Sequence, residues 1–125
     1  MEPSEAISIE AFPEYLDEQS DPEDERYVFS YHIIISNRGD QAATLRSRHW
    51  YITNGNGDIQ EVKGEGVVGE QPCIAANDYF EYSSGAVLST PVGSMRGYYV
   101  MEAENGRLFH ASIPVFTLAA THALN

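Results

Sequence analysis

The sequence predicts an all-β fold, an immunoglobulin- or fibronectin type III-like antiparallel β sandwich of about seven strands. Three observations support this fold class. Apolar and polar residues alternate in several short runs, as expected for strands with one buried face. Turn signals rich in glycine, proline and asparagine separate these runs. No segment has the apolar periodicity of a long helix, and 125 residues suffice for one domain with a substantial core. We therefore treat residues 1–125 as a single domain.

The first part of the chain contains the clearest strand pattern. Residues 6–10 alternate around Ile7 and Ile9 and predict a short first strand. The run 13–25 is acidic with no basic residue, which predicts an extended, solvated connection; the alternative is a weak divalent-cation site of clustered carboxylates. Residues 27–36 alternate throughout and predict a strand. Its expected core face consists of Tyr27, Phe29, Tyr31, Ile33 and Ile35.

The remaining strands are delimited by their turns. A strand is predicted over 43–53, with a bulge near Arg48 or His49 because the apolar positions there lose strict alternation. The Asn-Gly-Asn-Gly turn at 54–57 predicts a hairpin whose return strand is 59–62. Further strands are expected at 79–83, ended by Ser84 and Gly85, at 96–101, and at 107–115, where Pro114 marks the end of the strand or an edge position. An irregular connection is expected at 86–95 and a frayed tail or single turn at 116–125.

Composition limits the classes of function. Nineteen acidic against seven basic side chains give a formal net charge of -12, which argues against a nucleic-acid surface because phosphates would be repelled. The single cysteine allows no intramolecular disulfide and fits a reducing compartment. No apolar run approaches the roughly 18 residues needed to span a bilayer, and the first residues lack the basic start of a signal peptide. We expect a cytoplasmic protein without membrane insertion.

Three glycines at G-x-G-x-x-G spacing lie between two predicted strands. Glycine reaches positive φ without steric cost, so this loop could turn its backbone amides outward as an anion-binding nest. A dinucleotide fingerprint would also need a helix within a βαβ unit, and the residues that follow are too few and too poorly patterned for one. Glu65 and Glu70 would repel a polyanion unless a magnesium ion bridged them, so a loop-shaping role for the glycines is favoured over binding. The candidate ligand-binding residues are Lys63, Gly64, Gly66 and Gly69.

A second candidate region is the block Arg-Ser-Arg-His-Trp at 46–50. The favoured interpretation places the Trp50 indole in the core and pairs both arginines with nearby acids. The alternative is a protein-binding hot spot, since arginine and tryptophan dominate such patches. The candidate protein-interaction residues are Arg46, Arg48, His49 and Trp50.

No residue pattern indicates catalysis or a metal centre. His32, His49 and His110 lack metal-ligand spacing, so three separate histidines are favoured, with no metal and no cofactor. The Ser-Ser-Gly sequence at 83–85 has neither a nucleophile elbow nor a recognisable histidine and acid partner. We therefore expect a protein that is not an enzyme.

Four sequence blocks occur together in order along the chain: Arg-Tyr-Val-Phe at 26–29, Ser-Arg-His-Trp at 47–50, the glycine segment 64–72 and Thr-Pro-Val-Gly-Ser-Met at 90–95. With these blocks the chain resembles the ApaG family, also called CorD, over about residues 7–116. Residues 75–78 depart from the family pattern, in which a Pro-Gly turn is common. The resemblance implies a fibronectin type III-like sandwich in a bacterial cytosolic protein linked to cobalt resistance and magnesium efflux. It also implies a domain that recurs as an interaction module in F-box and DNA-polymerase-δ-interacting proteins, without established catalytic residues.

These observations lead to two functional expectations. The first is a non-enzymatic interaction module that presents the glycine loop and the adjacent strand at 48–50 to an unidentified protein partner, with strand addition at an exposed edge as one mode. The alternative is a sensor that binds phosphate, pyrophosphate or a magnesium-phosphate complex at the glycine loop.

Overall fold

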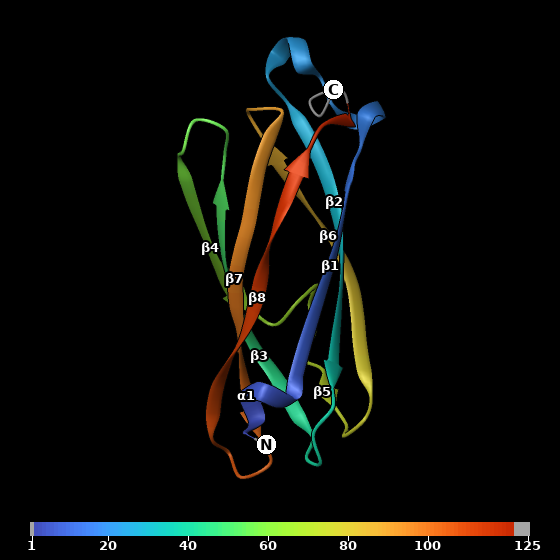
Figure 1. Cartoon of the computed structure of the whole chain (residues 1–125), viewed down its shortest axis with the longest axis vertical. Helices are drawn as coiled ribbons and strands as arrows, with labels where there is room; N and C mark the ends of the chain where they lie inside the picture. Colours follow the sequence, from blue (N-terminus) through green and yellow to red (C-terminus); the bar gives the residue numbers. More distant parts are fainter. Residues whose placement is uncertain (1, 122–125) are drawn as a thin grey trace.

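The structure is a computed structural model that describes residues 2–121. Eight strands and three short helical turns form a β sandwich, which confirms the predicted fold class (Figure 1). The strands are β1 (Ile7–Tyr15), β2 (Tyr27–Asn37), β3 (Ala43–Thr53), β4 (Ile59–Glu65), β5 (Cys73–Ile74), β6 (Tyr79–Leu88), β7 (Val92–Ala103) and β8 (Leu108–Ala119), and the helical turns are α1 (Pro3–Ala6), η1 (Asp17–Gln19) and η2 (Pro22–Asp24).

Two antiparallel sheets make up the sandwich. One has the order β1-β2-β6, and the other has the order β4-β3-β7-β8 with the short β5 paired to β3. On one side of the sandwich β1 lies against β8. On the opposite side, β4 and β6 are the edge strands of their sheets. The sandwich therefore has one closed side and one side where two strand edges lie free.

The acidic run differs from the predicted extended connection. Strand β1 continues through Pro13 to Tyr15, and the rest of the run forms η1 and η2. Pro13 lies opposite Tyr31 in the register with β2. Because β1 is an edge strand, a residue without an N–H group is tolerated there.

Strand β6 is also longer than predicted. It runs without interruption through Ser84 and Gly85 to Leu88, paired along β2. The prediction that these two residues end the strand was therefore wrong, because the cross-strand pairing outweighs the local turn signal.

The last two strands likewise extend beyond their predicted limits. Strand β7 already begins at Val92, within the expected irregular connection, and β8 ends at Ala119. Pro114 lies where the register between β7 and β8 shifts, so the proline marks a bulge of the edge strand β8 and not the end of the strand. The predicted tail is thus partly a strand, and residues 122–125 lie outside the described part of the chain.

The bulge in β3 lies at Arg46, not at Arg48 or His49. Leu45 and Ser47 pair with consecutive residues of β7, which leaves Arg46 as the extra residue. The bulge offsets the alternation, so that Arg48 and Trp50 point between the sheets while His49 points to solvent.

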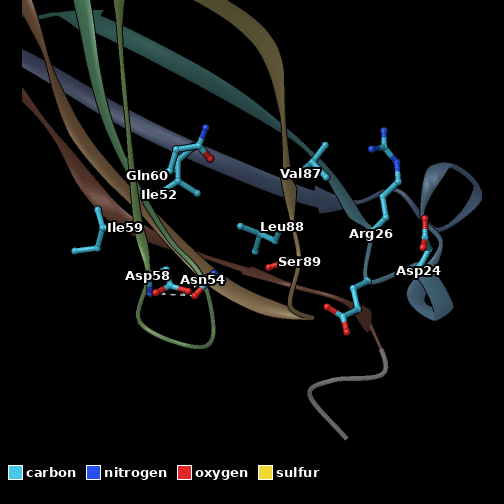
Figure 2. Close-up of a pocket in the computed structure, with 11 residues that line it drawn as sticks. Asp24, Arg26, Ile52, Asn54, Asp58, Ile59, Gln60, Val87, Leu88 and Ser89 are labelled. Atoms are coloured by element: carbon cyan, nitrogen blue, oxygen red, sulfur yellow. Dashed lines mark hydrogen bonds between the residues drawn. The ribbon is translucent and has the colours of Figure 1, made fainter.

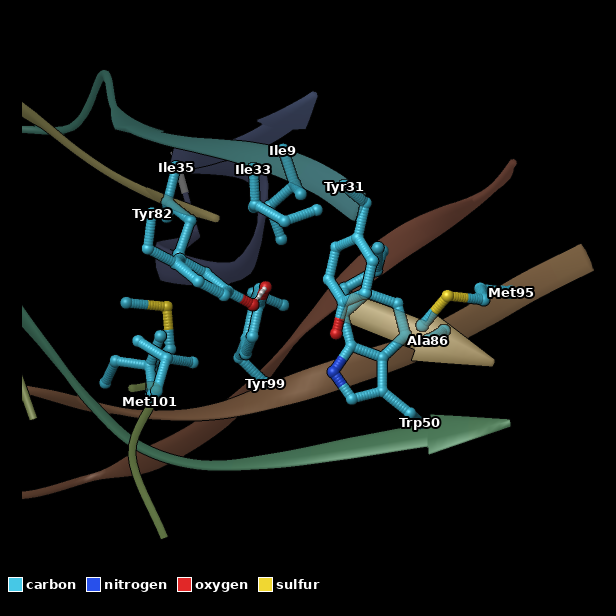
Figure 3. Packing of buried hydrophobic residues seen from close by; sticks show 14 of the residues in the cluster. Ile9, Tyr31, Ile33, Ile35, Trp50, Tyr82, Ala86, Met95, Tyr99 and Met101 are labelled. Carbon is cyan, nitrogen blue, oxygen red and sulfur yellow. Dashed lines mark hydrogen bonds between the residues drawn. The ribbon is translucent and has the colours of Figure 1, made fainter. Parts of the chain in front are cut away.

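The predicted core face of β2 is confirmed. Phe29, Tyr31, Ile33 and Ile35 are buried, and Tyr27 packs against them from a partly exposed position. The Trp50 indole meets the Tyr31 ring edge-on at 5.4 Å between centroids (Figure 3). Such edge-to-face pairs stabilise a core beyond the area that they bury.

One buried polar contact joins the two sheets. The hydroxyls of Tyr82 on β6 and Tyr99 on β7 share a hydrogen bond of 2.5 Å inside the core (Figure 3). Burial raises the pKa of both phenols far above its ordinary value. The pair stays neutral, and each hydroxyl satisfies the other.

Candidate functional site

The glycine loop is a tight β turn rather than an open nest. The Gly66 N–H donates to the Arg46 carbonyl at 2.8 Å. Val67 and Glu70 exchange two backbone hydrogen bonds, of 2.8 and 2.9 Å, around a turn of two residues with positive φ. This arrangement confirms that the segment joins β elements and begins no helix. Three amides of the glycine loop, those of Gly66, Val67 and Glu70, donate to backbone carbonyls.

Packing explains two of the three glycines. A Cβ at Gly66, where φ is +61°, would lie 2.2 Å from the Glu70 carbonyl oxygen. A Cβ at Gly64 would lie 2.8 Å from the Arg48 guanidinium, which crosses directly over it. The first glycine allows the chain to turn, and the second makes room for the arginine side chain.

Arg48 ties the glycine loop to β3. Its Nη1 donates to the carbonyls of Glu65 and Gly66, each at 3.0 Å. Within residues 2–121 it forms no salt bridge with a carboxylate. Carbonyl oxygens are neutral acceptors, so these contacts do not neutralise the guanidinium charge.

The guanidinium borders a cavity of about 320 Å³ between the two sheets, which we name the Arg48 cavity. Tyr31, Tyr82 and Ser84 form its wall on the three-stranded sheet, while Glu65 and the glycine loop form the other side. Burial raises the pKa of Tyr31, opposed by a hydrogen bond with Ser84 and by the charge of Arg48. The cavity thus holds one cation, one carboxylate and neutral hydroxyls.

The solvent side of the five-stranded sheet carries a row of stacked side chains. His110 stacks on Tyr98 at 4.3 Å between ring centroids, Tyr98 lies 4.9 Å from His49, and His49 stacks on Tyr51 at 4.7 Å. The Arg96 guanidinium lies over the Tyr51 ring at 4.5 Å. We name these five residues of β3, β7 and β8 the outer aromatic row.

Hydrogen bonds fix the centre of this row. His49 Nδ1 shares a hydrogen bond of 2.9 Å with the Tyr98 hydroxyl, and His49 Nε2 contacts Glu61 Oε1 at 2.5 Å. Lys63 lies 3.5 Å from the same carboxylate. The hydrogen bond from His49 lowers the pKa of Glu61 below its ordinary value. The imidazole is therefore held from both sides, and its neighbours on the outer side of the sheet leave 11% of its side chain exposed.

The structure divides the predicted interaction block between two faces. Trp50 is buried, with 2% of its surface exposed, and so is not an exposed anchor. Arg46 pairs with Glu102 at 3.0 Å, as the favoured interpretation expected, whereas Arg48 bonds to carbonyls. Only His49 joins the outer aromatic row.

Sequence reasoning missed the partners of His49. Arg96, Tyr98 and His110 lie in predicted strands, on the positions that alternate with the core. The sequence shows that these residues alternate with apolar positions in their strands. Which of them meet His49 depends on the strand register and on the bulge at Arg46. A scan for aromatic residues on the polar face of each strand could have found them.

A serine, histidine and glutamate group also escaped sequence reasoning. His32 Nδ1 lies 2.7 Å from Ser83 Oγ, and His32 Nε2 lies 3.2 Å from Glu81 Oε1, on the solvent side of the three-stranded sheet. The two strands place them together although His32 and Ser83 are 51 positions apart. The group lies on an exposed strand face, where water competes with such contacts.

The three histidines do not converge. His49 and His110 flank Tyr98 on one sheet, and His32 lies on the other. Over the described range, 2–121, no three His, Cys, Asp or Glu side chains are arranged to hold a metal ion. Over the same range no helix has the length and apolar character needed to cross a membrane.

Related proteins share this sequence and fold over most of their length. The family model described as ApaG domain matches residues 17–103. Protein ApaG of Aromatoleum aromaticum is 54% identical over 119 residues, which cover 95% of this chain and 94% of that protein. Protein ApaG of Thiobacillus denitrificans is 56% identical with the same coverage.

Solved structures agree with these matches. A putative ApaA protein from Bordetella pertussis superposes with a TM-score of 0.90 at 47% identity, covering 92% of this chain and 94% of that one. A structural genomics target solved by X-ray crystallography has a TM-score of 0.90 at 51% identity, covering 94% and 89%. A stretch of a Bacteroides uniformis β-glucuronidase, 17% identical with a TM-score of 0.56, shares the fold alone. The sequence blocks, the sandwich and these matches together show that the chain belongs to the ApaG domain family.

Proposed function

We propose that this chain is a non-enzymatic interaction module that binds a partner protein through its outer aromatic row. The observation that carries the proposal is the continuous stacking of five side chains over the solvent side of β3, β7 and β8. Tyrosine and arginine are among the residue types that dominate binding hot spots. A row of them on a solvent-facing sheet supports a role in recognition.

The row is also preorganised. The rings stack on one another, and His49 is held between the Tyr98 hydroxyl and Glu61. Side chains that are already ordered lose little conformational entropy when a partner binds. The neighbouring charges of Glu61 and Lys63 supply the polar rim that surrounds the apolar centre of many interfaces.

The glycine loop extends this surface at the free edge of the sheet. Lys63 and Gly64 lie on β4, beside the outer aromatic row. Arg48 holds the loop from the inner side of β3 by its hydrogen bond to the Gly66 carbonyl. We place the contact in the cytoplasm, in keeping with the lone cysteine. A link to cobalt resistance and magnesium efflux, which the family resemblance implies, would then act through the bound partner and not through a metal site in this domain.

Affinity capture with matched variants tests the proposal. The wild-type chain, Tyr98→Ala and the control Phe12→Ala would each be used as bait; Phe12 is 52% exposed and lies on the other sheet. We expect a partner that the wild type and the control retain, and that Tyr98→Ala loses. Equal capture by all three baits, or no specific partner, would contradict the proposal. Turnover of nucleotide polyphosphates by the purified chain would contradict its non-enzymatic part.

A second candidate function is binding of a small phosphate-containing anion, supported by Arg48. Its guanidinium borders the Arg48 cavity and has no carboxylate partner in the described residues. Because the Gly66 amide already bonds to the Arg46 carbonyl, the Arg48 guanidinium would supply the main attraction. Glu65 opposes it unless magnesium bridges the two charges.

Calorimetry separates the two possible anion sites. Pyrophosphate would be titrated with and without magnesium into the wild type, Arg48→Gln and Lys63→Gln. Binding in the Arg48 cavity predicts loss of heat only in Arg48→Gln, whereas binding on the outer side of the glycine loop predicts loss in Lys63→Gln. Absence of heat from the wild type at millimolar pyrophosphate would remove this second function.

A further inference from the structure

The free edge of β6 passes two pockets that differ in charge: the Arg48 cavity pairs one cation with one carboxylate, whereas the second pocket has three carboxylates and one cation. Towards the middle of the strand, Tyr82 and Ser84 border the Arg48 cavity. At its end, Val87 and Leu88 border a wider pocket of about 510 Å³, which we name the acidic groove. Among the described residues, 2–121, strand β6 pairs only with β2, so its other edge presents backbone groups without a strand partner in that range.

The acidic groove lies between β6 and the β3–β4 hairpin (Figure 2). Its polar boundary comprises Asp24, Glu25 and Asp58 against the single cation Arg26. Figure 2 shows Leu88 pointing into the space between β6 and the hairpin, while Val87 points to the other side of β6. Val87 is 47% exposed although it is paired with Val28 of β2, next to the end of the strand.

An added strand would cover the exposed Val87 side chain and close the groove over Leu88, which is already buried. Side chains of an extended segment alternate between the two faces of a sheet. One side chain would then enter the groove above Ile52 and Leu88, and the next would pack beside Val87. Strand addition gains main-chain hydrogen bonds along the edge, while the pockets select the side chains.

The charges beside β6 determine which charged side chains a bound extended segment would carry. Ser84 and Leu88 are four residues apart, which is about 13 Å along a strand. A segment lying on β6 can therefore bring an acidic side chain to Arg48 and, about four positions away, a basic side chain to Asp24 and Glu25. Complementary charges at the two ends would fix both the register and the direction of the segment.

We propose that the free edge of β6 binds an extended segment of a partner protein that carries an acidic and a basic residue about four positions apart, with apolar residues between them. A second copy of this chain fits less well, because its formal charge of -12 would meet the three carboxylates of the groove. This site lies on the inner side of β3, away from the outer aromatic row, and does not depend on it.

Selection from a displayed library of short random peptides tests this proposal. We expect wild-type protein to enrich peptides with the acidic and basic spacing described above. Val87→Ser should weaken binding of an enriched peptide by about tenfold, whereas Phe12→Ser, the same kind of change on an exposed strand position, should not. The double variant Asp24→Lys/Glu25→Lys should enrich peptides with an acidic residue in place of the basic one.

Other outcomes would overturn the proposal. Enrichment of no peptide, equal affinity of wild type and Val87→Ser, or unchanged charge preference in the lysine variant would each do so. Dimerisation that Val87→Ser abolishes would assign the edge to a second copy of the chain. Peptide binding that Tyr98→Ala removes and Val87→Ser leaves intact would place the peptide on the outer aromatic row, which would support the proposed function and not this edge.

Discussion

The two sides of β3 carry side chains in contrasting surroundings. The inner side carries Trp50, buried in the core, and Arg48, which fixes the glycine loop through carbonyl contacts. The outer side carries His49 and Tyr51, stacked in a row that faces solvent. Aromatic side chains on the inner side are explained by burial. Those on the outer side are not, which is why we assign recognition to them.

Loss of the Trp50 ring should be the largest effect on the inner side. Trp50→Ala removes a buried ring that packs edge-on against Tyr31, Tyr99 and Phe116. We expect the free energy of unfolding to fall by about 3–5 kcal/mol. The matched change on the outer side, Tyr51→Ala, should cost about 1 kcal/mol or less. Urea unfolding compares the two, and equal losses would remove the distinction between the sides.

Glycine substitution tests whether the loop depends on backbone packing. Gly66→Ala puts a Cβ against the Glu70 carbonyl at a positive φ and should cost more than about 2 kcal/mol. Gly69→Ala meets no atom and should cost about 1 kcal/mol, from its positive φ alone. Thermal unfolding measures both variants. A smaller loss of stability for Gly66→Ala than for Gly69→Ala would contradict the close contact between residue 66 and the Glu70 carbonyl.

The buried phenol pair links the two sheets at the inner side. Tyr99→Phe leaves the Tyr82 hydroxyl without its partner, which should cost about 1–3 kcal/mol. Adding Tyr82→Phe should then cost little, because no unsatisfied hydroxyl remains. A double-mutant cycle in urea measures the coupling between the two residues. Additive losses would contradict the shared hydrogen bond.

The smallest expected effect is the pH dependence of stability that comes from Glu61, on the outer side of the sheet. The hydrogen bond from His49 lowers the pKa of Glu61, so its stabilising contribution is present at neutral pH and is lost as pH falls through the lowered pKa. His49→Phe should raise the Glu61 pKa towards its ordinary value, and Lys63→Met should raise it less. Carboxyl chemical shifts followed by NMR give both values. An unchanged pKa in His49→Phe would contradict the contact.

The sequence predicts the fold better than the surfaces. Alternation over 27–36 was enough to place the core face of β2, because burial enforces the period of a strand. The end of β6 was missed at Ser84, where cross-strand pairing overrides local turn chemistry, whereas Pro114 marks an edge position in a bulge of β8. The outer aromatic row could not be assembled, because it joins β3, β7 and β8 through a register that is shifted by the bulge at Arg46.

The central claim is that partners bind the outer side of β3, β7 and β8. Amide chemical shifts of the isotope-labelled chain, recorded with and without a captured partner, test it most directly. We expect the largest changes at His49, Tyr51, Tyr98 and His110. Changes confined to β1 and β2, with these four residues unaffected, would contradict the claim.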